Sequence, residues 1–168
     1  MDNDLLTASA GTLVIGAGAT AVMDLWALAQ RHLLGIPSLD YRFVGRWLGH
    51  MPRGRLAHAA IGRAAPVPGE ATLGWAAHYA IGVAFAGVLL VVAGPAWMTQ
   101  PTLAPALAVG IGSIAAPFLI MQPAFGLGIA ASKTPKPWVA RLRSLVTHTV
   151  FALGLYLSGL VIAAVLRG

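Results

Sequence analysis

The residues best able to do chemistry in this sequence are a few polar side chains within long apolar stretches. Three of them, Asp24, His78 and His148, are ionisable, and Gln122 is a neutral fourth. Ionisable residues in a membrane segment are costly and usually face the interior of a bundle, so they are candidate functional residues. Histidine titrates near neutral pH, so these side chains suit the binding of a proton, a cation or a small solute.

The composition indicates that these side chains lie in helices that cross a membrane. Of 168 residues, 58% are hydrophobic and 10% are charged, whereas about a quarter of the residues in a soluble domain are charged. The mean hydropathy of +0.78 excludes an ordinary soluble domain and a disordered chain. The absence of cysteine excludes disulfides, thiolate zinc sites, iron–sulfur clusters and covalently attached haem.

The uncharged stretches predict an all-α integral membrane protein with a single domain, a four-helix transmembrane bundle. A crossing helix needs about 20 apolar residues, and charges and prolines divide the sequence into four such stretches. We expect transmembrane helices at about 6–30, 71–94, 102–132 and 143–166. Each helix then contributes one of the four polar residues, all in the same half of the membrane.

The basic residues predict the orientation of the chain. Ten of the eleven Lys and Arg residues fall in or beside the loops that follow the first and third helices. The positive-inside rule therefore predicts that these loops lie in the cytoplasm and that both termini lie on the outer side. This pattern explains the pI of about 10.9 without nucleic acid as a partner.

The cytoplasmic loop over 31–70 is too long for a plain connection. Leu39, Phe43 and Trp47 recur at helical spacing, with arginines such as Arg46 off that row. One interpretation is an interfacial helix near 38–51 whose arginines lie at anionic lipid headgroups. The other is a folded loop that caps the bundle. The loop histidines are expected to be in contact with water, namely His32, His50 and His58.

Small residues and prolines accompany the polar residues along the predicted helices. Small residues beside a polar one mark a face that packs against another helix, within the chain or in a homo-oligomer. The candidate packing residues are Gly16, Thr20, Gly74 and Gly82. Pro117 and Pro123 are expected to kink the third helix and free backbone carbonyls near Gln122.

The sequence gives little support to an enzyme. Gly16-x-Gly18-x-x-Ala21 matches a loose dinucleotide fingerprint, but it lies inside an apolar span with no second strand after it. Ser144, His148 and Asp24 imitate a catalytic triad, yet a serine one turn from a histidine on a helix commonly bonds the backbone. No catalytic residue is therefore assigned.

Several longer segments resemble a known family. They include GAGATAVMDLWAL at Gly16–Leu28, GIPSLDYRFVGRWLGHMPRGR at Gly35–Arg55 and APFLIMQPAFGLGIAASKTPKPWVARLRSL at Ala116–Leu145. Across nearly its whole length the chain resembles the DUF2938 family, bacterial inner-membrane proteins of unknown function. The resemblance implies a small polytopic membrane protein and supplies no mechanism.

Three functions remain open at this point. The first is a binding or transport module in which Asp24, His78, His148 and Gln122 form a site, with a metal ion among the possible ligands. The second is a structural or assembly subunit whose polar residues only fix helix packing, for example through a bond from Asp24 to a histidine. The third is a redox subunit with His78 and His148 as axial ligands of a non-covalent b-type haem.

Overall fold

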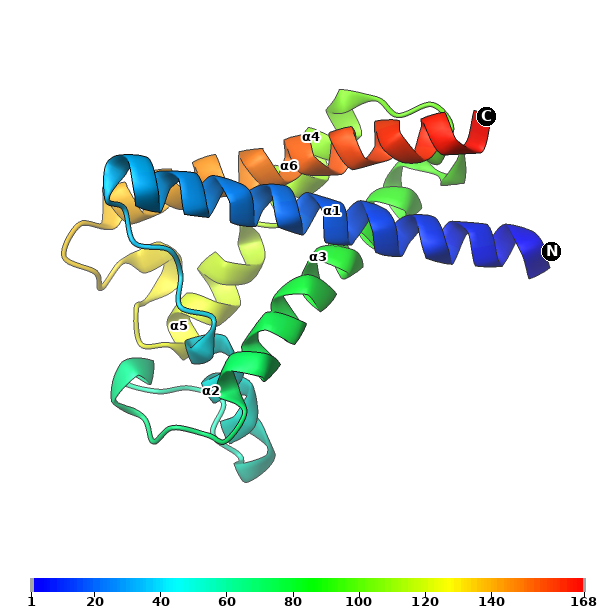
Figure 1. The fold of residues 1–168 in the computed structure, drawn as a ribbon. Coiled ribbons are helices and arrows are strands. Elements are labelled where there is room, and N and C mark those ends of the chain that lie inside the picture. The colour runs from blue at the N-terminus through cyan, green and yellow to red at the C-terminus, as the bar shows by residue number, and fades with distance from the viewer. Residues whose placement is uncertain (1, 168) are drawn as a thin grey trace. The chain divides into compact units, whose positions relative to one another are not determined.

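The computed structural model describes residues 2–167, with side chains from residue 6 onward. This described part is helical and contains no β-strand. The main helices in Figure 1 are α1 (Asp2–Leu34), α2 (Arg42–His50), α3 (Glu70–Ala93), α4 (Leu103–Gly112), α5 (Gln122–Ala124) and α6 (Pro137–Arg167). Short 3₁₀ turns connect them at Met51–Arg53, Ile61–Arg63, Pro95–Met98 and Ile129–Ala131.

Four segments of the described chain are long and apolar enough to cross a membrane. They are Leu6–Leu34, Glu70–Ala93, Leu103–Ala124 and Pro137–Arg167. The first helix ends at Leu34, about one turn beyond the expected end near residue 30. The fourth begins at Pro137 rather than near residue 143, because proline suits the first turn of a helix. The third ends at Ala124 rather than near residue 132, because Gly126 and Gly128 adopt positive φ angles of 84° and 73° that end the helix.

The chain divides into two compact units. The first, here the apolar unit, contains the chain up to Pro37, Tyr79–Ser113 and the chain from Thr147. The second, here the loop unit, contains Ser38–His78 and Ile114–Val146. Helices α3 and α6 each contribute residues to both units.

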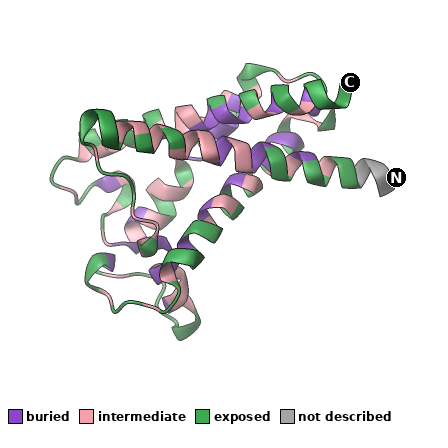
Figure 2. Cartoon of the chain, in the orientation of Figure 1, coloured by how far each residue is buried: buried purple, intermediate pink, exposed green. Residues whose placement is uncertain are grey.

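The apolar unit is held together by close helix contacts at small residues. Ile15, Leu89 and Leu155 are fully buried in its core (buried residues are purple in Figure 2). A Cβ atom added at Gly16 would lie 2.8 Å from the backbone nitrogen of Val83, so α1 and α3 touch at backbone distance. Gly82 of α3 faces Thr20 of α1 in the same contact. These small residues therefore pack helices of one chain against each other.

The loop unit is a folded structure with its own small core. Val44, Ile61, Ala124 and Phe125 form its buried apolar cluster. The backbone N–H groups of His58 and Ile61 donate to the carbonyls of Ala124 (2.8 Å) and Phe125 (3.2 Å). The long loop is therefore bonded to the carbonyls at the end of the third span, which would otherwise lack partners.

Pro117 and Pro123 of the third span bracket an irregular segment. A π-helical turn runs over Pro117–Met121, between α4 and the short α5. Such a turn is wider than an α-helix and often occurs at functional sites. Gln122 follows it directly, is 8% exposed, and has an Oε1 atom without a hydrogen-bond partner among the described residues.

Candidate functional site

Asp24 has a hydroxyl partner on a neighbouring helix of the apolar unit. The Tyr79 phenol of α3 donates to Asp24 Oδ2 of α1 at 3.1 Å. One turn before Asp24, the buried Thr20 hydroxyl donates to the Gly16 carbonyl at 2.8 Å. The small residues at this contact let α1 and α3 approach closely enough for the phenol to reach the carboxylate.

His148 is bonded to a serine at the end of another helix in the same unit. Ser113 Oγ lies 2.7 Å from His148 Nδ1 and donates to the Gly110 carbonyl at 2.6 Å. A hydroxyl has only one hydrogen, so Nδ1–H of His148 donates to Ser113 when Ser113 donates to Gly110. The other ring nitrogen of neutral His148, Nε2, then carries the lone pair that can take a proton.

The other two predicted site residues belong to the loop unit. The ring of His78 stacks on Tyr41, with centroids 4.0 Å apart and an interplanar angle of 24°. Gln122 follows the π-helical turn, as described above. The four predicted residues thus divide evenly, with Asp24 and His148 in the apolar unit and His78 and Gln122 in the loop unit.

Asp24 and His148 share one feature, since each is bonded to a hydroxyl group. Among the residues that the structure describes, no group of three or more His, Asp or Glu side chains is arranged to hold a metal ion. Asp24 and His148 instead each bond a hydroxyl group, which can donate or accept a hydrogen. Hydroxyl, carboxyl and imidazole groups together are the usual components of a proton relay.

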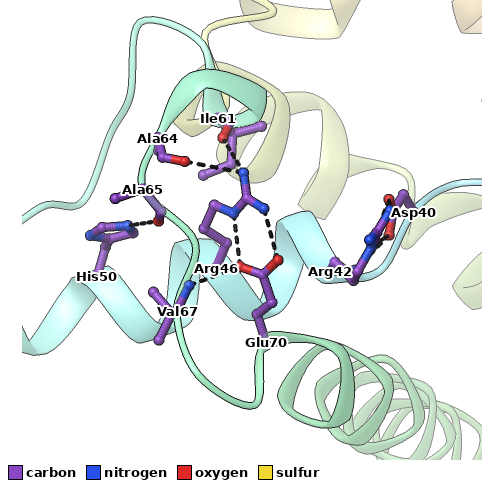
Figure 3. A network of polar contacts seen from close by, with 9 residues as sticks. All are labelled: Asp40, Arg42, Arg46, His50, Ile61, Ala64, Ala65, Val67 and Glu70. Atoms are coloured by element: carbon purple, nitrogen blue, oxygen red, sulfur yellow. Dashed lines mark hydrogen bonds and ion pairs between the residues drawn. The ribbon is translucent and has the colours of Figure 1, made fainter.

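Sequence reasoning missed the main polar network of the loop unit, shown in Figure 3. Arg46 on α2 binds both carboxylate oxygens of Glu70, with Nη2–Oε1 at 2.7 Å and Nε–Oε2 at 2.8 Å. Their side chains are only 10% and 13% exposed. Arg46 Nη1 also donates to the Ala64 carbonyl at 3.1 Å, and the backbone N–H of Val67 donates to Glu70.

The network changes two expectations about the loop. Arg46 is buried against Glu70, so it does not lie at the surface where lipid headgroups would be found. The expectation that the loop histidines contact water is wrong for His50 and His58. His50 is 5% exposed, and both ring nitrogens of His58 are buried without hydrogen-bond partners among the described residues.

The rings of His50 and His58 are neighbours. Their ring centroids are 5.1 Å apart, and Nε2 of His50 lies 2.9 Å from the Ala65 carbonyl. Burial lowers the pKa of His58 below its usual value, and the nearby His50 and Arg55 lower it further, whereas the Ala124 carbonyl opposes the shift. Folding of the loop unit therefore favours the neutral form of His58 over the protonated form.

Comparison with known proteins gives a family and no characterised relative. A family model described as "Protein of unknown function (DUF2938)" matches residues 13–162. No curated protein shows a significant match, and neither does any solved structure. Because the match covers most of the sequence, this chain belongs to the DUF2938 family.

Proposed function

We propose that this protein is a polytopic membrane protein that binds an exchangeable proton in its apolar spans, as part of a binding or transport module. The observation that carries this proposal is the pairing of Asp24 with Tyr79 and of His148 with Ser113. Each pair joins a titratable side chain to a hydroxyl group of a neighbouring segment. The coupled solute, if the module transports one, is a small molecule or cation.

Exposed apolar side chains support insertion into a bilayer. Val91 and Val165 are 86% and 70% exposed, and Leu6 is 68% exposed. A surface of this kind is unfavourable in water and suits hydrocarbon chains. The clustering of basic residues in two loops supports a bacterial cytoplasmic membrane location with those loops inside and both termini outside.

The chemistry of the two pairs supports proton exchange. The ionised Asp24 carboxylate accepts a hydrogen bond from the Tyr79 phenol. A protonated Asp24 can instead donate to the phenol oxygen, so the contact survives a change of protonation state. The same holds for His148, whose Nδ1–H bond to Ser113 is retained whether or not Nε2 is protonated. A site that keeps its geometry in both states can load and release a proton without repacking.

A structural role is the second candidate, and the same bonds favour it. Asp24–Tyr79 joins α1 to α3, and Ser113–His148 joins the end of α4 to α6. Bonds between helices in an apolar medium can fix their relative rotation and register. Under this alternative the polar residues contribute stability, and their protonation has no further consequence.

Carbodiimide labelling tests whether Asp24 takes up a proton, which the proposed function requires. Dicyclohexylcarbodiimide, an apolar reagent, reacts with protonated carboxyl groups in apolar surroundings, and mass spectrometry of protein in nanodiscs locates the adduct. We expect an adduct on Asp24 that diminishes at higher pH and is lost in Asp24→Asn. Asp40, whose carboxylate is bonded to Arg42, is the internal control and should stay unlabelled. Labelling of Asp24 no greater than that of Asp40 would contradict the proposal.

A further inference from the structure

A cavity in the loop unit has a strongly basic wall. It has a volume of about 530 Å³ and is lined by His50, Arg53, Arg55, Ala65, Pro66, Val67 and Pro68. The turn that carries both arginines depends on Gly54, which adopts the left-handed conformation with φ 73° between them. This turn lets two residues so close in sequence contribute to the same wall.

The positive charge of this wall is not neutralised within the chain. Arg53 and Arg55 are exposed and form no ion pair with any described residue. Arg42 and Arg46, by contrast, each bind a carboxylate. No acidic residue lines the cavity, and two guanidinium groups without carboxylates make it a site for an anion.

The backbone of the wall offers little to an anion. Pro66 and Pro68 have no N–H group, and the N–H of Val67 donates to Glu70 at 3.0 Å. Pro66, Val67 and Pro68 therefore offer no free backbone donor, and the charged donors of the wall are the guanidinium groups of Arg53 and Arg55. Guanidinium groups recognise phosphate oxygens through paired hydrogen bonds.

We propose that this cavity binds the phosphate group of a phosphomonoester. Arg53 and Arg55 donate to its charged oxygens. A phosphomonoester has its second pKa near about 6, so near neutral pH much of it carries two negative charges, one for each guanidinium group. A phosphodiester carries one negative charge and matches the two guanidinium groups less well. The cavity volume leaves room for the group esterified to the phosphate.

This proposal stands on the loop unit and does not depend on the proton site of the apolar unit. The phosphomonoester has two sources, a lipid such as phosphatidic acid or a soluble phosphate compound. Both present the same group to the same two guanidinium groups. The experiment therefore uses one probe for each source.

The test measures binding to full-length protein purified in detergent. Calorimetry with inorganic phosphate probes the soluble source. Native mass spectrometry with phosphatidic acid probes the lipid source, and phosphatidylglycerol is its phosphodiester control. The variants are Arg53→Gln and Arg55→Gln. The matched control is Arg63→Gln, which removes an exposed charge from the same loop outside the cavity wall.

We expect Arg53→Gln and Arg55→Gln each to weaken binding about tenfold or more, the usual effect of losing a charge-assisted hydrogen bond. Arg63→Gln should change it less than about twofold. Arginine-dependent binding of inorganic phosphate supports a soluble ligand, and arginine-dependent binding of phosphatidic acid alone supports a lipid. Binding of neither probe, equal binding of phosphatidylglycerol, or equal effects of all three substitutions would overturn the proposal. Carbodiimide labelling of Asp24 should be unchanged in these variants, so the two proposals fail separately.

Discussion

The Arg46 guanidinium holds the Glu70 carboxylate in a two-point ion pair, with bonds of 2.7 and 2.8 Å between residues 24 positions apart. This pair joins α2 to the beginning of α3, and Arg46 also binds the carbonyls of the chain between them. A helix of nine residues is too short to be stable alone. The ion pair therefore fixes α2 and the connecting loop as one folded unit.

Removal of Arg46 should open the loop unit. Arg46→Ala leaves the Glu70 carboxylate buried without its partner, which we expect to cost about 3 kcal/mol. Hydrogen exchange of the amides in 42–70 measures the free energy of this opening. The control is Arg42→Ala, whose ion pair with Asp40 is exposed, and it should have a far smaller effect. Equal protection in the two variants would contradict a stabilising role for the Arg46–Glu70 pair.

The loop unit should lose stability in mild acid. The pKa of His58 is lowered in the folded state, so below about pH 6.5 the unfolded chain binds a proton more readily than the folded one. The free energy of unfolding therefore falls as the pH is lowered through 6.5 and is greatest above it. Hydrogen exchange between pH 8 and pH 5, corrected for intrinsic rates, measures this slope. The slope should diminish in His58→Gln, and an unchanged slope would rule out His58 as its source.

The contact between α1 and α3 should not tolerate a larger residue at Gly16. In Gly16→Ala the new methyl group meets the backbone of Val83, and we expect a loss of about 1–3 kcal/mol from overpacking. Gly112→Ala is the matched control, because a Cβ there meets nothing within 4 Å. Thermal unfolding in detergent compares them. A Gly16→Ala protein as stable as Gly112→Ala would mean that the two helices are not in backbone contact.

Tyr79→Phe separates the hydrogen bond from the carboxylate that accepts it. The substitution removes only the donor to Asp24, and the loss of one such bond costs about 1 kcal/mol. Under the proton-site account, labelling of Asp24 by carbodiimide persists in Tyr79→Phe, because the substitution leaves the carboxyl group itself and the apolar residues around it unchanged. Loss of labelling in Tyr79→Phe at unchanged thermal stability would contradict this prediction, because it would mean that Asp24 takes up a proton only when the phenol is present.

The sequence located the four long apolar segments well because hydropathy and charge are local properties. The third span was the exception, since its end depends on the positive φ angles of Gly126 and Gly128 and on backbone bonds from the loop. Family membership also followed from the sequence. Asp24 and His148 were recognised as unusual, but their partners Tyr79 and Ser113 were not, because hydroxyl residues are common in membrane helices and carry no distinct signal.

The loop was harder to predict because its contacts are not local. Helical spacing indicated a helix near 38–51, and α2 lies within that range. Nothing in the spacing indicated that Arg46 would pair with Glu70 or that His50 and His58 would be buried together. A charged residue at the boundary of an apolar span, as Glu70 is, was the one available signal for an ion pair with the preceding loop.

Proton movement across a membrane tests the central claim most directly. Purified protein in proteoliposomes is placed under a potassium diffusion potential, and a pH-sensitive dye inside reports proton entry. Asp24→Asn and His148→Gln should each reduce the flux by about a hundredfold, the usual effect of losing a proton-transfer group. Thr12→Val, which removes a hydroxyl bonded only within its own helix, should retain it. Equal flux in the wild type, Asp24→Asn and empty liposomes would contradict a proton-conducting role for the Asp24 and His148 pairs.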